Sequence, residues 1–95
     1  MTAYMIMDIE VLDPLQYETY KREVPSLVEK HGGEYLVRGG EFEVIEGEWN
    51  PVRLVIFSFP DRQAIHALLD DPEYHPLKLL RHKVTTSSIV VVDGL

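Results

Sequence analysis

The strongest indication of the fold is one run of residues, Val52-Arg53-Leu54-Val55-Ile56-Phe57-Ser58-Phe59. A β-strand places alternate residues on opposite faces, so Leu54 and Ile56 would share one face. Phe57 and Phe59 would share the other face. Both faces are therefore apolar, which is typical of a strand that is covered on both sides.

Two other segments repeat this two-sided pattern. In residues 3–11 every odd position is apolar, and Tyr4 and Ile6 make the first half of the opposite face apolar as well. Residues 88–92, Ser-Ile-Val-Val-Val, are apolar on both sides. We predict a strand in each segment.

The remaining strand is predicted from a shorter run, residues 35–37, Tyr-Leu-Val. Gly39-Gly40 would interrupt it as a bulge or bend, and the strand is expected to resume over residues 42–46. The turn-forming residues 47–51 would then connect it, as a hairpin, to the strand that begins at Val52.

The first helix is predicted to open at Asp13-Pro14, with Asp13 as the N-cap and Gln16 at the capping-box position. Pro25 removes one helical hydrogen bond and is expected to kink or divide this helix, which Gly32-Gly33 ends. The buried face of the helix would carry a stripe made of Tyr17, Tyr20, Val24, Leu27, Val28 and His31.

Two more helices are predicted towards the C-terminus. Asp61 is the expected N-cap of one, and Asp71-Pro72 opens the other. Their buried stripes would be Ala64, Ile65, Leu68 and Leu69 in the former, and Tyr74, Leu77 and Leu79 or Leu80 in the latter. Residues 85–88 carry hydroxyl groups without the context of a nucleophile and are interpreted as a turn.

The order βαββαβ predicts an α+β, ferredoxin-like fold, with a four-stranded antiparallel sheet and the helices on one face. Helices would then cover one face of the sheet, whereas three of its strands are apolar on both. Each large apolar side chain gains about 1.5–3 kcal/mol when it is buried. We therefore expect a second copy of the chain to cover the other face, giving a homodimer through the sheet face.

Composition limits the functions that are open to this chain. Its 95 residues suit a single domain, residues 1–95, and its net charge of −7 without a basic cluster argues against nucleic acid and anionic membranes as partners. No stretch approaches the roughly 20 apolar residues of a membrane span. Cysteine is absent and the N-terminus does not read as a signal peptide, so a cytoplasmic location is expected.

Several short motifs fall in order along the chain. They are Ala3-Tyr4, Asp13-Pro14 with Tyr17 and Tyr20, Gly32-Gly33, Arg38-Gly39-Gly40, Glu46-Gly47, Trp49, Phe59-Pro60, Pro72-Glu73-Tyr74 and Arg81. In combination they resemble the domain-of-unknown-function family 1330, of the dimeric α+β barrel superfamily, over nearly the whole chain. The resemblance implies a homodimer whose sheets face each other, and it implies no mechanism. More distant relatives of this architecture include cofactor-independent monooxygenases, isomerases, haem enzymes and ligand-sensing domains, among which fold alone does not choose.

Three residues are candidates for binding a ligand. Arg38 precedes two glycines that let the backbone approach a ligand closely, and its guanidinium suits a carboxylate; the alternative is an ion pair with a nearby glutamate. Those glutamates are Glu41, Glu43 and Glu46. Arg53 would supply a second cation. Trp49 would line a pocket or, as the alternative, cap the barrel end or the dimer seam.

Three further residues are candidates for proton transfer. His75 has the suitable chemistry, and Tyr74 and Tyr20 would converge with it on a cleft between helices and sheet. The alternative for both tyrosines is core packing. The four histidines show no metal-ligand spacing, so neither a metal nor another cofactor is expected.

The sequence favours a binding function without settling it. The leading hypothesis is a cytoplasmic homodimeric domain that binds a small, partly apolar anion between sheet and helices. One alternative is an enzyme of the cofactor-independent isomerase or monooxygenase type. The other is a purely structural or partner-binding dimer.

Overall fold

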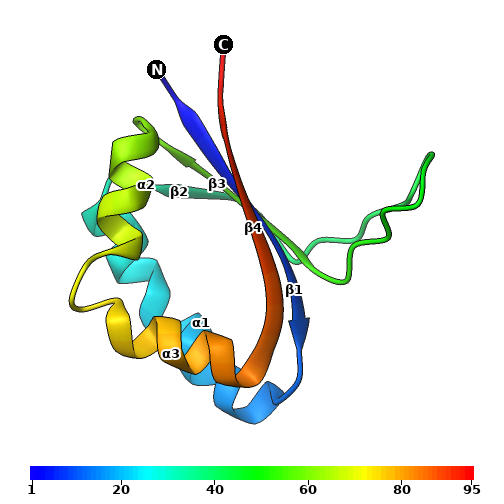
Figure 1. The fold of residues 1–95 in the computed structure, drawn as a ribbon, viewed down its shortest axis with the longest axis horizontal. Helices are drawn as coiled ribbons and strands as arrows, with labels where there is room; N and C mark the ends of the chain where they lie inside the picture. Colours follow the sequence, from blue (N-terminus) through cyan, green and yellow to red (C-terminus); the bar gives the residue numbers. More distant parts are fainter.

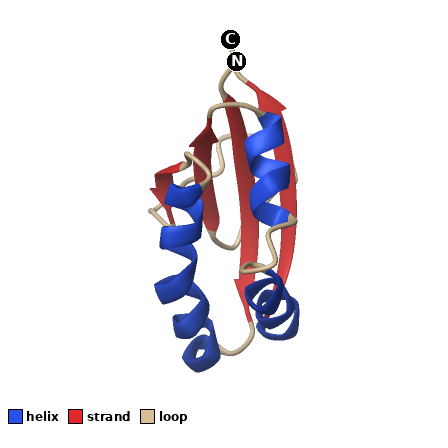
Figure 2. Ribbon diagram, turned by 90° about the vertical axis from the view of Figure 1, so that its left-hand side faces the viewer, coloured by secondary structure: helices blue, strands red, loops and turns tan.

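The computed structural model describes residues 1–95 and consists of one sheet with helices on a single side (Figure 1). The elements are β1 (Ala3–Val11), α1 (Pro14–Lys30), β2 (Glu34–Arg38), β3 (Leu54–Phe59), α2 (Arg62–Leu69), α3 (His75–Val84) and β4 (Thr85–Asp93). The strand order is β2-β3-β1-β4, with every pair antiparallel. Figure 2 shows all three helices in front of the same face of the sheet. This is the predicted ferredoxin-like α+β fold.

The core lies between this sheet face and the helices. Met5, Met7 and Ile9 of β1 project into it, as do Phe57 and Phe59 of β3, and all of them are buried. Alternate burial along β1 and β3 matches the period of two read from the sequence.

The other sheet face has no helix over it, and we call it the outer face. Val90 and Val92 of β4 are 59% and 47% exposed there. Ile6 lies on the same face, because it pairs with Val90 of β4 on one side and with Ile56 of β3 on the other. The two-sided apolar pattern is confirmed, and the chain itself covers only one of the two sides.

Two helix starts follow the predicted capping residues. The third does not, because α3 begins at His75 and not at Asp71-Pro72, and no side chain caps it. The Asp13 carboxylate accepts hydrogen bonds from the backbone N–H of Gln16 at 3.2 Å and from its side-chain amide at 2.7 Å. Asp61 accepts the N–H of Ala64 at 2.8 Å. Both carboxylates satisfy N–H groups that have no partner within the first helical turn.

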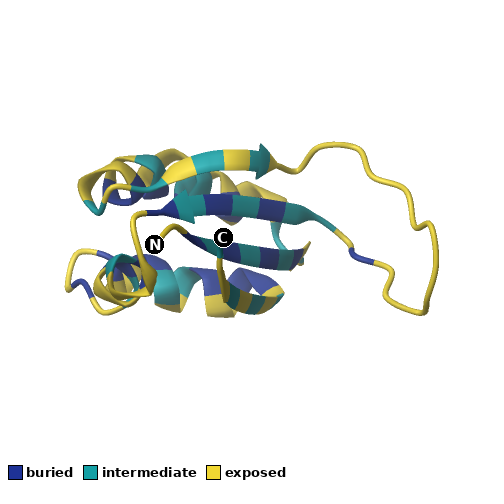
Figure 3. Ribbon diagram, turned by 90° about the horizontal axis from the view of Figure 1, so that it is seen from above, coloured by how far each residue is buried: buried dark blue, intermediate teal, exposed yellow.

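The prediction that the second strand resumes over residues 42–46 is wrong. β2 ends at Arg38, and residues 40–51 form an extended arm that projects away from the sheet (Figures 1 and 3). No backbone–backbone hydrogen bond involves these residues. The alternation of glutamates with Phe42 and Val44 resembles a strand, but no neighbouring strand pairs with it. The irregularity expected at Gly39-Gly40 lies instead between Tyr35 and Val37.

Two other local predictions also need correction. Helix α1 runs through Pro25 without a break, so the proline neither divides nor ends it. Residues 85–88 belong to β4, not to a turn, because α3 passes directly into the strand at Thr85. The Thr85 hydroxyl donates to the Arg81 carbonyl at 2.6 Å, which satisfies the end of the helix. No helix has the length and apolar character that crossing a membrane requires.

Candidate functional site

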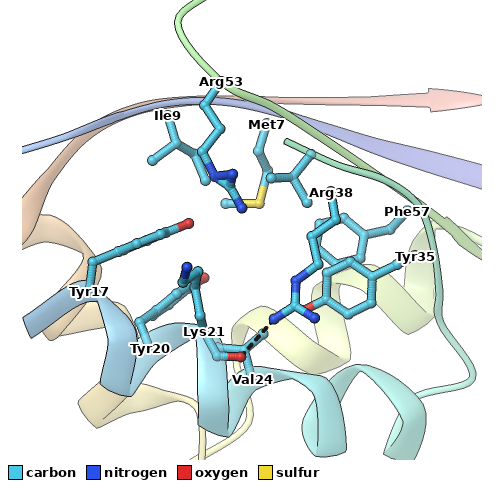
Figure 4. Close-up of a pocket in the computed structure, with 11 residues that line it drawn as sticks. Met7, Ile9, Tyr17, Tyr20, Lys21, Val24, Tyr35, Arg38, Arg53 and Phe57 are labelled. Carbon is cyan, nitrogen blue, oxygen red and sulfur yellow. Dashed lines mark hydrogen bonds between the residues drawn. The ribbon is translucent and has the colours of Figure 1, made fainter. Parts of the chain in front are cut away.

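A small cavity lies between α1 and the sheet (Figure 4). Its free space is about 20 Å³, which is enough for about one water-sized group. Most of its wall is apolar or aromatic, and three cationic side chains complete it. The lining residues are Met7, Ile9, Tyr17, Tyr20, Lys21, Val24, Tyr35, Arg38, Arg53, Val55 and Phe57.

Arg53 reaches this cavity from the residue that precedes β3. Its Nε is buried and has no hydrogen-bond partner in the protein. Its guanidinium lies against Gly39, where a Cβ atom would overlap it. Gly39 has a φ of 72°, so the backbone at this position also disfavours any side chain. Glycine at the end of β2 therefore makes room for Arg53.

Arg38 lies on the other side of the cavity mouth, at the end of β2. Its Nη2 donates to the backbone carbonyl of Lys21 at 2.9 Å, and its guanidinium lies 4.8 Å from the centre of the Tyr35 ring. The alternative of an ion pair with a glutamate of the arm does not occur, because none of the ion pairs involves Arg38.

Pro25 explains why the Lys21 carbonyl is available to Arg38. In a regular helix the N–H of residue 25 would donate to the carbonyl of residue 21, but proline has no N–H. The interruption that the sequence predicted is therefore real at the level of one hydrogen bond. Its effect is to give Arg38 an anchor on α1, while the helix continues past the proline.

The cavity opens into a charged basin on the surface. Glu18, Lys21, Arg22, Arg38 and Arg53 line it, so four cations face one carboxylate. Lys21 forms an ion pair with Glu18 at 2.9 Å, which leaves the three arginines without an acidic partner in the basin. The chain as a whole has a net charge of −7, so this basin is a local concentration of positive charge. Such a basin attracts anions.

Three tyrosines supply most of the aromatic wall. The Tyr17 and Tyr20 rings stack at 5.6 Å, and both point from α1 towards the sheet (Figure 4). The Tyr20 hydroxyl is 2.8 Å from the hydroxyl of Tyr74, to which Arg81 Nε donates at 3.3 Å. Burial, and then the neighbouring Tyr74, raise the pKa of Tyr20 far above its ordinary value. Burial likewise raises the pKa of Tyr17 and of Tyr35.

The structure brings together two of the three proton-transfer candidates. Tyr20 and Tyr74 share a hydrogen bond, and Tyr74 is buried in the core. His75 begins α3, is exposed, and lies outside the cavity wall. No hydrogen bond joins its ring to either tyrosine. The two tyrosines therefore meet, but of the three candidates only Tyr20 lines the cavity.

Trp49 lies on the outer face and lines neither the cavity nor the basin. Its indole N–H donates to Asp8 at 3.2 Å, and it borders an apolar hollow with Ile6 and Val90. Burial raises the pKa of Asp8, but hydrogen bonds from the Val52 N–H, the Trp49 indole and the Arg53 N–H outweigh this effect. The pKa of Asp8 is therefore below its ordinary value. Asp8 fixes the end of the arm to β1.

Sequence reasoning missed the contribution of α1 to this site. Lys21 and Arg22 complete the basin, and Tyr17 lies one turn before Lys21 on the same helix face. Pro25 was the available signal, since a proline in a helix leaves a carbonyl free one turn earlier, which here is that of Lys21. No three His, Cys, Asp or Glu side chains are placed to hold a metal ion.

Comparisons with known proteins identify a family and a fold. A family model described as a domain of unknown function, DUF1330, matches residues 2–95. No curated protein matches the sequence. A protein of unknown function from Rhodopseudomonas palustris has a similar structure, with a TM-score of 0.77 and 17% identity over 99% of this chain and 82% of that one.

Two further solved structures share the fold. A variant of SnoaB, a cofactor-independent oxygenase from Streptomyces nogalater, has a TM-score of 0.70 at 14% identity, and the match covers 98% of this chain and 92% of that one. Rv0793 from Mycobacterium tuberculosis has a TM-score of 0.59 at 16% identity, with 100% and 96% covered. At these identities the likeness establishes the architecture alone.

Proposed function

The chain belongs to the DUF1330 family of domains of unknown function and has the dimeric α+β barrel fold, and from this premise we propose that it binds a small, partly apolar organic anion. The anion would occupy the basin on α1, with its charged group between Arg38 and Arg53. The uncharged part of the ligand would lie against the apolar and aromatic wall at the mouth of the cavity behind them. The observation that carries this proposal is the cluster of arginines without acidic partners at the mouth of a tyrosine-lined cavity.

Charge supports an anion as the ligand. Guanidinium groups bind carboxylates through paired N–H donors, and the buried Nε of Arg53 is a donor without a partner. A buried donor that lacks a partner is costly, so a ligand that accepts from it gains the corresponding free energy. In an acidic chain, a basin of this sign also selects anions from solution.

The wall of the cavity favours binding over catalysis. It contains no carboxylate, imidazole or thiol that would act as a base. Its tyrosines have raised pKa values and stay protonated near neutral pH. Glu18, at the rim of the basin, is paired with Lys21, whose hydrogen bond lowers the pKa of that carboxyl.

A cofactor-independent enzyme is the second candidate, because the fold is shared with the oxygenase SnoaB. In that case the arginines would hold an acidic substrate, and the tyrosine hydroxyls would supply protons. Consumption of an added organic acid, with or without oxygen uptake, distinguishes this candidate from simple binding.

We further propose that the protein is a homodimer whose outer faces meet. The outer face carries large exposed apolar side chains that no element of the chain covers, and sheets of this fold class pair in this way. The cysteine-free composition suits the reducing conditions of the cytoplasm. A dimer with an empty basin would be the purely structural alternative.

Titration with butyrate, followed through backbone amide NMR signals, tests the binding function. We expect butyrate to shift signals around Lys21, Arg38 and Arg53, and butyramide, its uncharged analogue, to leave them in place. Arg53→Gln should abolish the response. Arg62→Gln is the matched control, because Arg62 lies outside the basin and pairs with Asp93 at 2.9 Å. An equal response in Arg53→Gln, or none in the natural protein, rejects the proposal.

A further inference from the structure

Arg81 is a buried cation without an acidic partner. It is 4% exposed, and none of its hydrogen-bond partners is a carboxylate: they are the hydroxyl of Tyr74 at 3.3 Å, the hydroxyl of Ser87 at 2.7 Å and the ring of His82 at 3.4 Å. None of the ion pairs of the protein includes it. Its contact with Tyr74 therefore connects a positive charge to the tyrosine pair beside the cavity.

The donor character of arginine fixes the direction of this chain of hydrogen bonds. A guanidinium only donates, so the Tyr74 oxygen accepts from Arg81. If Tyr20 also donated to Tyr74, the Tyr74 proton would be left in the core without an acceptor, which is costly. The lower-energy arrangement has Tyr74 donate to Tyr20 over their 2.8 Å contact.

The hydroxyl proton of Tyr20 then remains free to donate to something else. Of the three hydrogen-bonded residues, only Tyr20 lines the cavity, so a group in the cavity can accept a hydrogen bond from its hydroxyl. The positive charge of Arg81 polarises both hydroxyls in the same direction and strengthens this last donor. Because burial and Tyr74 raise its pKa, the Tyr20 hydroxyl keeps its proton at neutral pH.

We propose that Tyr20 donates a hydrogen bond to a neutral oxygen of the ligand, so that the site prefers 2-oxo acids to plain carboxylic acids. This inference rests on the proposed anion site and deepens it. The carboxylate would lie in the basin between Arg38 and Arg53. The cavity behind them has space for about one water-sized group, so an acceptor oxygen must be close to the carboxylate in the ligand. A carbonyl on the adjacent carbon satisfies this requirement.

The test compares two ligands that differ in one group, 2-oxobutyrate and butyrate. In the natural protein we expect 2-oxobutyrate to bind about fivefold more tightly, the value of one ordinary hydrogen bond. Tyr20→Phe should reduce that ratio to about one, because phenylalanine keeps the ring and removes only the donor. Tyr74→Phe removes the polarising link and should give an intermediate ratio.

The ratio is measured within each variant, so a partial loss of folded protein changes both affinities equally and leaves it unchanged. Tyr4→Phe is the control, since Tyr4 lies on the outer face and its ring does not line the cavity. Equal affinities for the two acids in the natural protein, or a preference that survives in Tyr20→Phe, would overturn the role of Tyr20. Failure of both acids to bind would instead reject the anion site itself.

Discussion

At the scale of single residues, Gly39 decides where Arg53 lies. Its φ of 72° belongs to the left-handed region, and a Cβ there would overlap the guanidinium. We predict that Gly39→Ala lowers the free energy of unfolding by about 1–3 kcal/mol and weakens butyrate binding, because Arg53 must move. Urea unfolding and the amide titration measure the two effects.

The neighbouring glycine offers a matched control. Gly40 has no atom within 4 Å of the position where a Cβ would lie, and its φ is not positive. Gly40→Ala should therefore change neither quantity. If both alanine variants behave alike, the space at Gly39 has no special role.

Asp71 is a carboxylate whose charge contributes to stability. Its carboxylate accepts hydrogen bonds from Lys30 at 2.9 Å, from His31 at 2.7 Å and from the Glu73 N–H at 2.9 Å. These bonds, the one from Lys30 foremost, hold its pKa well below the ordinary 3.8. A lowered pKa in the folded state stabilises the protein above the unfolded value, and the stabilisation is lost as the pH falls below it.

We therefore predict that Asp71→Asn lowers the midpoint temperature of unfolding at neutral pH. The difference in midpoint temperature between the variant and the natural protein should narrow as the pH falls below about 4. Thermal unfolding followed by circular dichroism over this pH range measures the difference. Asp70→Asn is the control, because the Asp70 side chain forms no hydrogen bond or ion pair. A difference that stays constant into the acid range contradicts the assignment to the Asp71 charge.

At the scale of elements, Pro25 links helix α1 to the site. Replacing it by alanine restores an N–H that competes with Arg38 for the Lys21 carbonyl. Pro25→Ala should raise the free energy of unfolding by about 1–2 kcal/mol, as a helix former replaces proline, and weaken butyrate binding about threefold. Chemical denaturation and the same titration measure the two changes.

The opposite signs of these two changes make the test specific. Pro14→Ala is the control, because Pro14 occupies the first position of α1, where a missing N–H has no helical partner to lose. A variant at Pro25 that is more stable and binds equally well would show that Arg38 does not depend on this carbonyl.

The elements whose pattern repeats were predictable from the sequence. Alternation fixed the faces of β1 and β3, and Asp13 and Asp61 marked two helix starts. The arm was not predictable from the sequence, because glutamates alternating with Phe42 and Val44 have the period of a strand whether or not a neighbouring strand pairs with them. Pairing is a property of the whole sheet, and local pattern does not contain it.

The candidate site was predictable only where its residues lie beside regular strands. Arg38 and Arg53 were found from their chemistry; Arg38 ends β2 and Arg53 directly precedes β3, and these two strands are neighbours in the sheet. Trp49 and His75 have equally suggestive chemistry, but the arm carries Trp49 to the outer face and α3 leaves His75 in solvent. The direction of a side chain from an irregular segment depends on tertiary contacts, such as the bond from Trp49 to Asp8.

At the scale of the whole molecule, the outer face predicts the oligomeric state. Val90 of the edge strand β4 is 59% exposed on this face, beside Ile6. We predict that Val90→Asp converts a dimer to a monomer, because pairing two outer faces would bury a carboxylate on each side without a partner. Sedimentation velocity at micromolar concentration measures the change.

The control for this experiment lies on the helix side. Leu15 is 82% exposed at the start of α1, so Leu15→Asp adds the same charge outside the outer face. It should leave the sedimentation coefficient unchanged. A natural protein that sediments as a monomer, with its outer face in water, would remove the dimer from the proposed function.

The arm has a practical consequence for handling the protein. Ile45 is 83% exposed and no backbone–backbone hydrogen bond involves residues 40–51, so we expect proteases to cleave the chain in this arm. A single cut would separate β1, α1 and β2 from the rest of the chain, but β3 and β4 pair with β1 on either side, and β3 also pairs with β2. The two fragments should therefore stay together as one folded particle, and genes encoding them separately should reconstitute the domain when expressed side by side.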